Sequence, residues 1–324
     1  MKRRWLTAAA VNLGAAVLAA LAFALWKRAD LVDQGNDETR MEGSITLGGF
    51  YDQGMEDVGF ITRANRQVTA RKLAGSRVLY DVSYATGPHG FRVVPDANQA
   101  QHCVLLFGDS LTFGEGVNDG ETTAAQIVAR SKGTVAAQSL GIGGWGPHQL
   151  LGGLQSGRFQ RAITCQPTDA VYLFIPAHTG RAAGRGRWDQ HGPLFYLEAN
   201  GHLVRAGNFN TASTSWRELI GLNRLTEEQE EDLSAALIAE AARELQRLYP
   251  GLRFHVFMWD GTTAGMLKRL SDRDLRAHTI RAFIPDYSDA YLIAPPVEAH
   301  PNPRAYEKLA DYILALLADT GRRP

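Results

Sequence analysis

The clearest pattern begins near residue 101, where short apolar runs alternate with segments whose apolar positions recur at helical spacing. The apolar runs contain few polar residues and fall at residues 104–107, 170–175 and 253–259. Such runs predict strands that are covered on both faces. Residues 225–248 predict the longest helix, because Thr226 and Gln229 form a capping box at its start and leucines share one face.

Strands and helices in this order predict an α/β fold with a doubly wound, mostly parallel, five-stranded sheet over residues 101–324. Further elements complete the pattern: helices at residues 121–131, at residues 147–154 and after Asn302, and strands at residues 134–137 and 291–294. Residues 181–214 form an insertion. Within it, Asn200-Gly201 separates two β-like runs, which predicts a hairpin.

The region before this domain divides into four parts. Residues 44–100 contain β-like runs at 77–84 and 91–95 and predict an N-terminal β extension. Residues 5–26 are almost uninterrupted apolar and would span about 33 Å as a helix, enough to cross a bilayer core. Basic residues within 1–4 predict a cytoplasmic leader, and polar residues 27–43 a tether.

We therefore expect a single-pass anchor in a bacterial inner membrane, with the main domain in the periplasm or another extracytoplasmic space. The alternative is a cleaved signal peptide and secretion. Cys103 and Cys165 each stand next to a predicted strand. If those strands are neighbours, the two thiols can bridge in an oxidising compartment; two separately buried thiols are the other possibility.

Charge limits the classes of partner. The chain has 34 basic and 34 acidic residues and no long basic run, which argues against nucleic acid as a partner. Neither a glycine-rich phosphate loop nor a cluster with metal-ligand spacing is recognisable in the sequence. We therefore expect no cofactor and no metal.

Three residues at opposite ends of the main domain suggest acyl-transfer chemistry. Ser110 directly follows the first apolar strand, and His300 lies two residues after Glu298 near the end of the chain. A serine hydroxyl becomes nucleophilic when a histidine takes its proton, and a carboxylate can orient that histidine. Because both segments follow strands of one parallel sheet, we expect these side chains to meet at its carboxyl edge.

Three sequence blocks carry a family resemblance. They are GDSLTFG at residues 108–114, SLGIGGWGPHQ at residues 139–149 and EAHPNP at residues 298–303. Together they resemble the GDSL-type, or SGNH, hydrolase superfamily, and the similar region runs from about residue 84 to the end. The resemblance implies a flavodoxin-like SGNH fold. It also implies Ser110 as nucleophile, His300 as base and Glu298 as the acid, a position where the family usually has aspartate.

The resemblance leaves several roles open. Asp286 or Asp289 is an alternative to Glu298 as the acid. The backbone N–H groups of Ser110 and Gly144 correspond to the oxyanion donors of the family. The family's third donor is an asparagine, and His178 stands in its place, either as a substitute donor or as a structural histidine. Trp145 and Arg181 are candidate substrate contacts, and Trp188 is an alternative to Trp145 for stacking on a sugar, but a solvated face with a packing tryptophan is the more common use of such residues.

These expectations combine into a membrane-anchored, extracytoplasmic serine esterase that cleaves acyl esters, in particular O-acetyl esters, of an envelope glycan or lipid through an acyl-enzyme. One alternative is an O-acyltransferase that uses the same site. The other, from a different class, is a non-catalytic envelope assembly or glycan-binding module.

Overall fold

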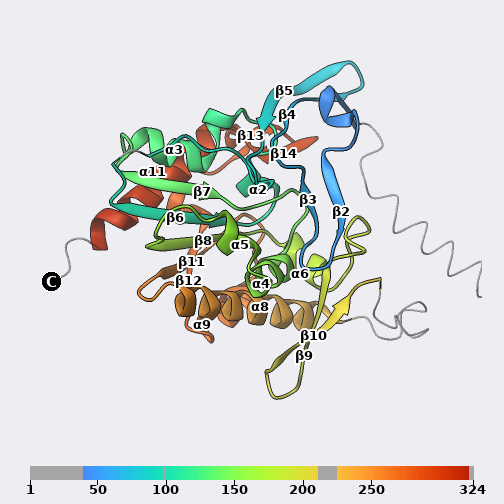
Figure 1. Ribbon diagram of the computed structural model, residues 1–324, viewed down its shortest axis with the longest axis vertical. Coiled ribbons are helices and arrows are strands. Elements are labelled where there is room, and N and C mark those ends of the chain that lie inside the picture. Colours follow the sequence, from blue (N-terminus) through green and yellow to red (C-terminus); the bar gives the residue numbers. More distant parts are fainter. Residues whose placement is uncertain (1–38, 98, 211–224, 321–324) are drawn as a thin grey trace, which may run out of the picture.

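The computed structural model describes residues 39–97, 99–210 and 225–320. Its centre is a five-stranded sheet with the order β12-β11-β8-β6-β7, in which every neighbouring pair is parallel (Figure 1). The strands are β6 (His102–Phe107), β7 (Val135–Ser139), β8 (Asp169–Phe174), β11 (Arg253–Met258) and β12 (Arg276–Thr279). This is the 2-1-3-4-5 order of flavodoxin-like sheets, with its switch point between β6 and β8. The expected α/β fold with a parallel five-stranded sheet is therefore confirmed.

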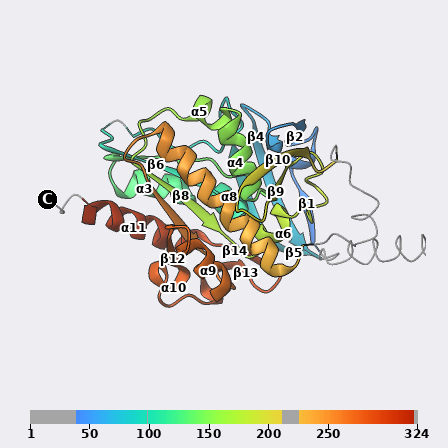
Figure 2. The ribbon, with the colours of Figure 1, turned by 90° about the horizontal axis from the view of Figure 1, so that it is seen from below.

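Helices cover both faces of the sheet (Figures 1 and 2). One face carries α3 (Thr123–Arg130), α10 (Ile280–Phe283) and α11 (Pro303–Thr320); the other carries α4 (Pro147–Gln155), α5 (Arg158–Ala162), α8 (Glu227–Leu248) and α9 (Ala264–Ser271). Along β6, Val104 and Leu106 pack on the face covered by α3, α10 and α11, whereas Leu105 and Phe107 pack on the face covered by α4, α5, α8 and α9. Both faces of this strand are buried because successive side chains point to opposite sides.

The fifth strand differs from the expected one. We expected it at residues 291–294, but β12 (Arg276–Thr279) takes the edge position beside β11. The segment β13 (Leu292–Ala294) pairs instead with β14 (Glu298–Pro301) in a separate antiparallel ribbon. The sequence Arg-Ala-His-Thr of β12 has no apolar run, because an edge strand pairs on one side only and is partly exposed.

The N-terminal β extension consists of two small antiparallel sheets. One has the order β1-β4-β5, and the other is the ribbon β2-β3. Their strands are β1 (Thr39–Glu42), β2 (Tyr51–Met55), β3 (Gly59–Thr62), β4 (Gln67–Ala74) and β5 (Arg77–Ala85). The extension thus begins within the stretch expected as a tether. Of the expected run at residues 91–95, only Arg92 makes a β-bridge, with Thr86.

Two further segments pack against the main domain. The expected hairpin is present as β9 (Pro193–Leu197) and β10 (Leu203–Asn208), which pair antiparallel. The strand β5 of the extension contacts β13, so the N-terminal sheet lies against the ribbon that contains Glu298. The remaining short helices are α2 (Ser110–Phe113), α6 (Ala177–Ala182), η1 (Ser44–Thr46), η2 (Asp119–Glu121) and η3 (Asp289–Tyr291).

Cys103 and Cys165 are joined by a disulfide. Cys103 lies on β6, and Cys165 precedes its neighbour β8, so the adjacency of these strands brings the two thiols together. Within residues 39–97, 99–210 and 225–320, no helix is both long and apolar enough to cross a membrane. The expected span at residues 5–26 lies outside the described residues.

Candidate active site

Ser110 stands at the turn between β6 and α2. Gly108 has a φ of +149°, and a Cβ at this position would lie 2.5 Å from Oγ1 of Thr112, so the bend requires glycine. Asp109 caps α2, its side chain accepting a hydrogen bond from the N–H of Leu111 at 3.1 Å. This local geometry makes Ser110 the first residue of the helix, at the carboxyl end of a central strand.

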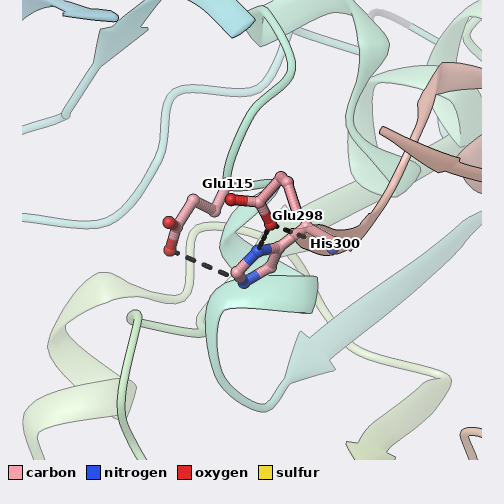
Figure 3. A group of neighbouring side chains, drawn as sticks. All are labelled: Glu115, Glu298 and His300. Atoms are coloured by element: carbon pink, nitrogen blue, oxygen red, sulfur yellow. Dashed lines mark hydrogen bonds and ion pairs between the residues drawn. The ribbon is translucent and has the colours of Figure 1, made fainter. Parts of the chain in front are cut away.

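The structure brings Ser110 and His300 together although they are 190 positions apart in the chain. Oγ of Ser110 lies 2.8 Å from Nε2 of His300. On the other side of the ring, Nδ1 contacts Oε1 of Glu298, as Figure 3 shows. Because a carboxylate can only accept, Nδ1 carries the proton and Nε2 is left with a lone pair directed at the serine hydroxyl.

The carboxylate beside His300 belongs to Glu298 and not to either aspartate considered as an alternative. The backbone N–H of His300 also donates to Oε1 of Glu298, at 3.1 Å, which fixes the carboxylate against the β14 backbone. The side chain of Glu298 is only 2 % exposed. Asp286 instead accepts a hydrogen bond from the Tyr291 hydroxyl at 2.7 Å. Asp289 begins the η3 turn.

Burial and neighbouring charges shift the pKa values of Glu298 and His300 in opposite directions. Burial alone would raise the pKa of Glu298, but the hydrogen bond from His300 and the ammonium of Lys72 outweigh it and lower the pKa to about 2. Burial would likewise lower the pKa of His300, but the carboxylates of Glu115 and Glu298 raise it to about 8. The site therefore favours an ionised Glu298 and a basic imidazole.

Two residues near this group carried no sequence signal. Glu115, in the loop after α2, places Oε2 3.6 Å from Nε2 of His300 (Figure 3). Lys72, on β4 of the N-terminal extension, places Nζ 2.5 Å from Oε2 of Glu298. Neither stands in a recognisable motif, and both are far from Glu298 in sequence. Only the inward alternation of β4, which puts a lysine on the face shared by Val68 and Ala70, distinguishes Lys72.

The loop at residues 141–146 lies beside the serine. A Cβ at Gly143 would be 3.8 Å from Cβ of Ser110, so this loop closely approaches the nucleophile. Gly144 has a φ of +86°, and a Cβ there would lie 2.7 Å from Nε1 of Trp188, so this position also requires glycine. The N–H groups of Ser110 and Gly144 remain the expected oxyanion donors.

His178 does not occupy the position of a third oxyanion donor. Its ring is fully buried, with Nδ1 2.9 Å from the hydroxyl of Tyr172 and Nε2 3.3 Å from Oδ2 of Asp109. Burial lowers the pKa of His178 below its usual value, although Asp109 opposes this. With its Nε2–H directed at Asp109, the neutral ring has no second N–H for a substrate. The expectation is corrected: His178 supports the residue that precedes Ser110.

Arg181 and Trp145 are likewise structural rather than substrate contacts. Nη1 of Arg181 lies 2.7 Å from Oδ2 of Asp109 and donates to the carbonyl of Trp145 at 2.8 Å. Trp145 is only 2 % exposed, and its indole N–H donates to the carbonyl of Phe60 at 2.9 Å. Trp188, by contrast, is 54 % exposed, and its indole N–H donates to the carbonyl of Gly144 at 3.2 Å.

A cleft of about 260 Å³ opens beside Gly143 and Glu115. It is mostly apolar, and its wall comes largely from the N-terminal extension: Met41, Ile45, Thr46, Phe50, Tyr51, Tyr80 and Tyr84, with Phe113, Glu115 and Gly143 from the main domain. Through Gly143, which closely approaches Ser110, one wall of the cleft lies near the serine.

Glu115, Glu298 and His300 each bring a possible metal-ligand atom to within 4.8 Å of the others. Their observed partners favour another use of these atoms. Nε2 of His300 faces Ser110, and Oε2 of Glu298 is paired with the ammonium of Lys72. A divalent cation would have to approach that ammonium closely, so the residues present suit a hydrogen-bonded catalytic group better than a metal centre.

No family model matches the sequence, and no curated protein matches it. Solved structures do show a remote likeness. A lipolytic protein of the G-D-S-L family from Veillonella parvula has 13% sequence identity, a TM-score of 0.40 and coverage of 67% of this chain and 98% of its own. The esterase EstA from Pseudoalteromonas sp., solved with monoethylphosphonate as inhibitor, has 13% identity, a TM-score of 0.40 and coverage of 69% and 100%.

An acetyl xylan esterase from the rumen bacterium Butyrivibrio proteoclasticus has 12% identity and a TM-score of 0.41, covering 70% of this chain and 65% of its own. Likeness at this level does not by itself assign an activity. What decides the chemistry of this chain is the contact of Ser110, His300 and Glu298.

Proposed function

We propose that the protein is a serine esterase of the SGNH type. The observation that carries this proposal is the 2.8 Å separation of Ser110 Oγ and His300 Nε2, with Glu298 on the opposite side of the ring. A nucleophile, a base and an orienting carboxylate in this relation are the recurring parts of acyl transfer. The same geometry argues against a purely non-catalytic module, which has no need for such an alignment.

The first half of the reaction forms an acyl-enzyme. Oγ of Ser110 attacks the ester carbonyl carbon while Nε2 of His300 takes the hydroxyl proton. The carbonyl oxygen becomes an oxyanion held by the N–H groups of Ser110 and Gly144. When the tetrahedral species collapses, the bond to the alkoxide breaks, and His300 gives it the proton. The alcohol leaves, and the acyl group stays on Ser110.

The second half returns the enzyme to its starting state. His300 takes a proton from water, whose oxygen attacks the acyl carbon, and the collapse releases a carboxylic acid as Ser110 regains its proton. Glu298 stays ionised throughout and stabilises the imidazolium that forms in each half. If a sugar hydroxyl replaces water, the same steps describe an O-acyltransferase.

We further propose that the substrate is an O-acylated glycan, with acetyl as the acyl group. Trp188 supports this, because an exposed indole fixed beside Gly144 offers a flat apolar surface next to the proposed oxyanion site. A lipid ester is the competing substrate, and the apolar lining of the cleft is compatible with it. The two substrates differ in whether the alcohol portion of the ester contacts the indole of Trp188.

An extracytoplasmic location completes the proposal. The disulfide of Cys103 and Cys165 supports it, since such bonds persist in oxidising compartments. The apolar segment at residues 5–26 is proposed as the membrane anchor. Fractionation of cells, followed by protease treatment of intact spheroplasts, would test both points. Digestion of the domain from the outer side is expected; full protection would contradict the proposed orientation.

The decisive test compares the protein with its Ser110→Ala and His300→Ala variants on a short-chain aryl acetate. We expect both variants to lose at least about a thousandfold in kcat/KM. A serine-directed phosphonate should add covalently to Ser110 of the unaltered protein, as mass spectrometry of peptides would show. Equal activity in all three proteins would refute the serine esterase.

Hydrolysis and transfer are separated by a second measurement. The protein is incubated with an acyl donor and a soluble oligosaccharide, and both free acid and acylated sugar are quantified. Release of free acid at the rate of donor consumption indicates an esterase. Stoichiometric acylation of the sugar would instead favour the transferase.

A further inference from the structure

The N-terminal extension contributes a charged side chain to the interior of the proposed active site. On β4, Val68, Ala70 and Lys72 occupy the inward positions of an alternating strand. The register with β5 shifts directly after Lys72, an irregularity of the kind that redirects side chains beside functional sites. An inward lysine in such a strand needs a buried anionic partner, because an isolated buried ammonium is costly.

That partner is the acid of the catalytic group. Nζ of Lys72 lies 2.5 Å from Oε2 of Glu298, while Oε1 of Glu298 contacts His300. The two oxygens of one buried carboxylate thus have different partners. Lys72 also lies 3.9 Å from Oε1 of Glu115 and 6.0 Å from the ring centre of Tyr80, which limits its movement.

We propose that Lys72 is a positioning residue of the active site, which holds Glu298 ionised and oriented so that its other oxygen binds Nδ1 of His300. This inference rests on the proposed esterase function. It gives the N-terminal sheet a part in catalysis that the sequence blocks of the main domain do not indicate. Lys72 acts through Glu298 and does not itself contact the reacting atoms.

The physical argument compares the site with and without this ammonium. A glutamate has a longer and more mobile side chain than aspartate, and both contacts of Glu298 with His300 go to Oε1, so without Lys72 the carboxylate could turn about that oxygen. Lys72 fixes the second oxygen and balances one of two carboxylates near the ring. Without it, Glu298 and Glu115 both face His300 uncompensated, and the proton on the ring is held more tightly.

The test uses the full-length chain and the aryl acetate assay. Lys72→Met removes the charge and keeps much of the side-chain volume, whereas Lys72→Arg keeps the charge. Arg71→Met is the matched control, because Arg71 is the neighbouring outward residue of the same strand and pairs with the exposed Asp81, at 3.7 Å. All variants are compared by circular dichroism and thermal unfolding.

We expect Lys72→Met to lower kcat at least about tenfold with KM changed less than twofold, and to move the acidic limb of the pH–rate profile to higher pH. The relevant charged groups around His300 are Glu298 on β14, Glu115 after α2 and Asp109 before it. Lys72→Arg should recover most of kcat, and Arg71→Met should behave like the unaltered protein. A folded Lys72→Met variant whose kcat and acidic limb of the pH–rate profile are both unchanged overturns the inference.

A double-mutant cycle separates positioning from general support of the fold. If Lys72 acts through Glu298, then adding Lys72→Met to a Glu298→Gln background should cause no further loss of kcat. A full additional tenfold loss in that background would overturn the inference, since it would show an effect independent of Glu298.

The failure of this inference is distinguishable from that of the esterase itself. Titration of the His300 imidazole, followed by proton NMR, does not need turnover. We expect its midpoint to rise in Lys72→Met even when Ser110 is replaced by alanine. An unchanged midpoint counts against Lys72 alone, whereas full activity of Ser110→Ala counts against the esterase alone.

Discussion

Oε2 of Glu115 lies 3.6 Å from Nε2 of His300, the same ring nitrogen that faces the hydroxyl of Ser110. A carboxylate so placed attracts the proton that the base takes from the serine. The charge of Glu115, together with the hydrogen bond and charge of Glu298, opposes the effect of burial on His300, and the pKa of the ring rises to about 8. His300 is therefore a stronger base than an ordinary histidine, and its ring loses the second proton only at a higher pH.

This pKa predicts the pH dependence of the reaction. Below about pH 8 the ring is protonated and cannot accept the serine proton, and above that pH it is neutral and competent. We therefore expect kcat/KM for the aryl acetate to rise tenfold per pH unit on the acidic side and to level off above a midpoint near pH 8. A midpoint at or below about 6.5, the value of an unperturbed histidine, would contradict this assignment.

Replacing Glu115 tests the cause of that midpoint. Glu115→Gln keeps the shape of the side chain and removes its charge, so the imidazolium loses a stabilising partner and the midpoint should move to lower pH. Activity at pH 6 should consequently rise relative to its plateau. Asp81→Asn, an exposed position on β5, is the control and should leave the midpoint in place. An unmoved midpoint in Glu115→Gln would assign the shift to Glu298.

The buried pair before the nucleophile predicts a large stability effect. Asp109 is fully buried, and its carboxylate faces Arg181 and His178. Arg181→Met removes the cation and leaves a buried charge, which should cost about 3 kcal/mol in the free energy of unfolding by urea. Because Asp109 also caps α2, kcat should fall as Ser110 loses its fixed position.

A surface ion pair provides the comparison for Arg181. Arg243 pairs with Glu240 on the exposed face of α8. Arg243→Met should change the unfolding free energy by less than about 0.5 kcal/mol, since exposed helical pairs contribute little. Similar effects of the two substitutions would mean that the pair at Asp109 is not structurally important.

The disulfide predicts a redox-dependent stability. Cys103 and Cys165 are separated by 62 positions. Closing a loop of this size removes conformational entropy from the unfolded chain, which corresponds to about 4 kcal/mol of free energy.

 The disulfide therefore stabilises the fold by restricting the conformations of the unfolded chain. The double variant Cys103→Ala, Cys165→Ala should unfold at lower temperature and lose the sensitivity to reductant that the unaltered protein shows. Equal melting temperatures with and without dithiothreitol would contradict a structural bridge.

Trp188 gives a prediction about substrate class. Trp188→Ala removes the exposed indole beside Gly144 but leaves the serine, its base and its acid untouched. We expect KM for an acetylated oligosaccharide to rise about tenfold, with little change in kcat/KM for the aryl acetate. Parallel losses on both substrates would point to a disturbed oxyanion loop instead of a lost sugar contact.

Much of the fold could be predicted because its signals are local. Each central strand except β12 has an apolar run, and α8 begins at a capping box that the structure contains between Thr226 and Gln229. The same holds for α11, where Asn302 accepts a hydrogen bond from the N–H of Ala305 at 3.3 Å. β12 was missed because its four residues carry no apolar periodicity.

The site could be predicted only where residues stand in recognisable blocks. Ser110, Glu298 and His300 lie in such blocks, and they come together in the structure. Lys72 and Glu115 act across large sequence separations, which no local pattern reveals.

His178, Arg181 and Trp145 show a different limit. Their positions in the chain correctly placed them near the serine, but a sequence does not tell whether a polar side chain faces a ligand or a buried neighbour. The side chains of all three point to buried neighbours: His178 and Arg181 face Asp109, and Trp145 faces the carbonyl of Phe60.

The separation of 190 positions between Ser110 and His300 has a consequence for the growing polypeptide. The serine leaves the ribosome early, whereas its base follows only with the last ribbon, β14, and is anchored by the helix α11 behind it. A nascent or truncated chain that ends before residue 298 therefore holds a hydroxyl with no proton acceptor. Reactivity is acquired only once the segment that carries His300 has been made.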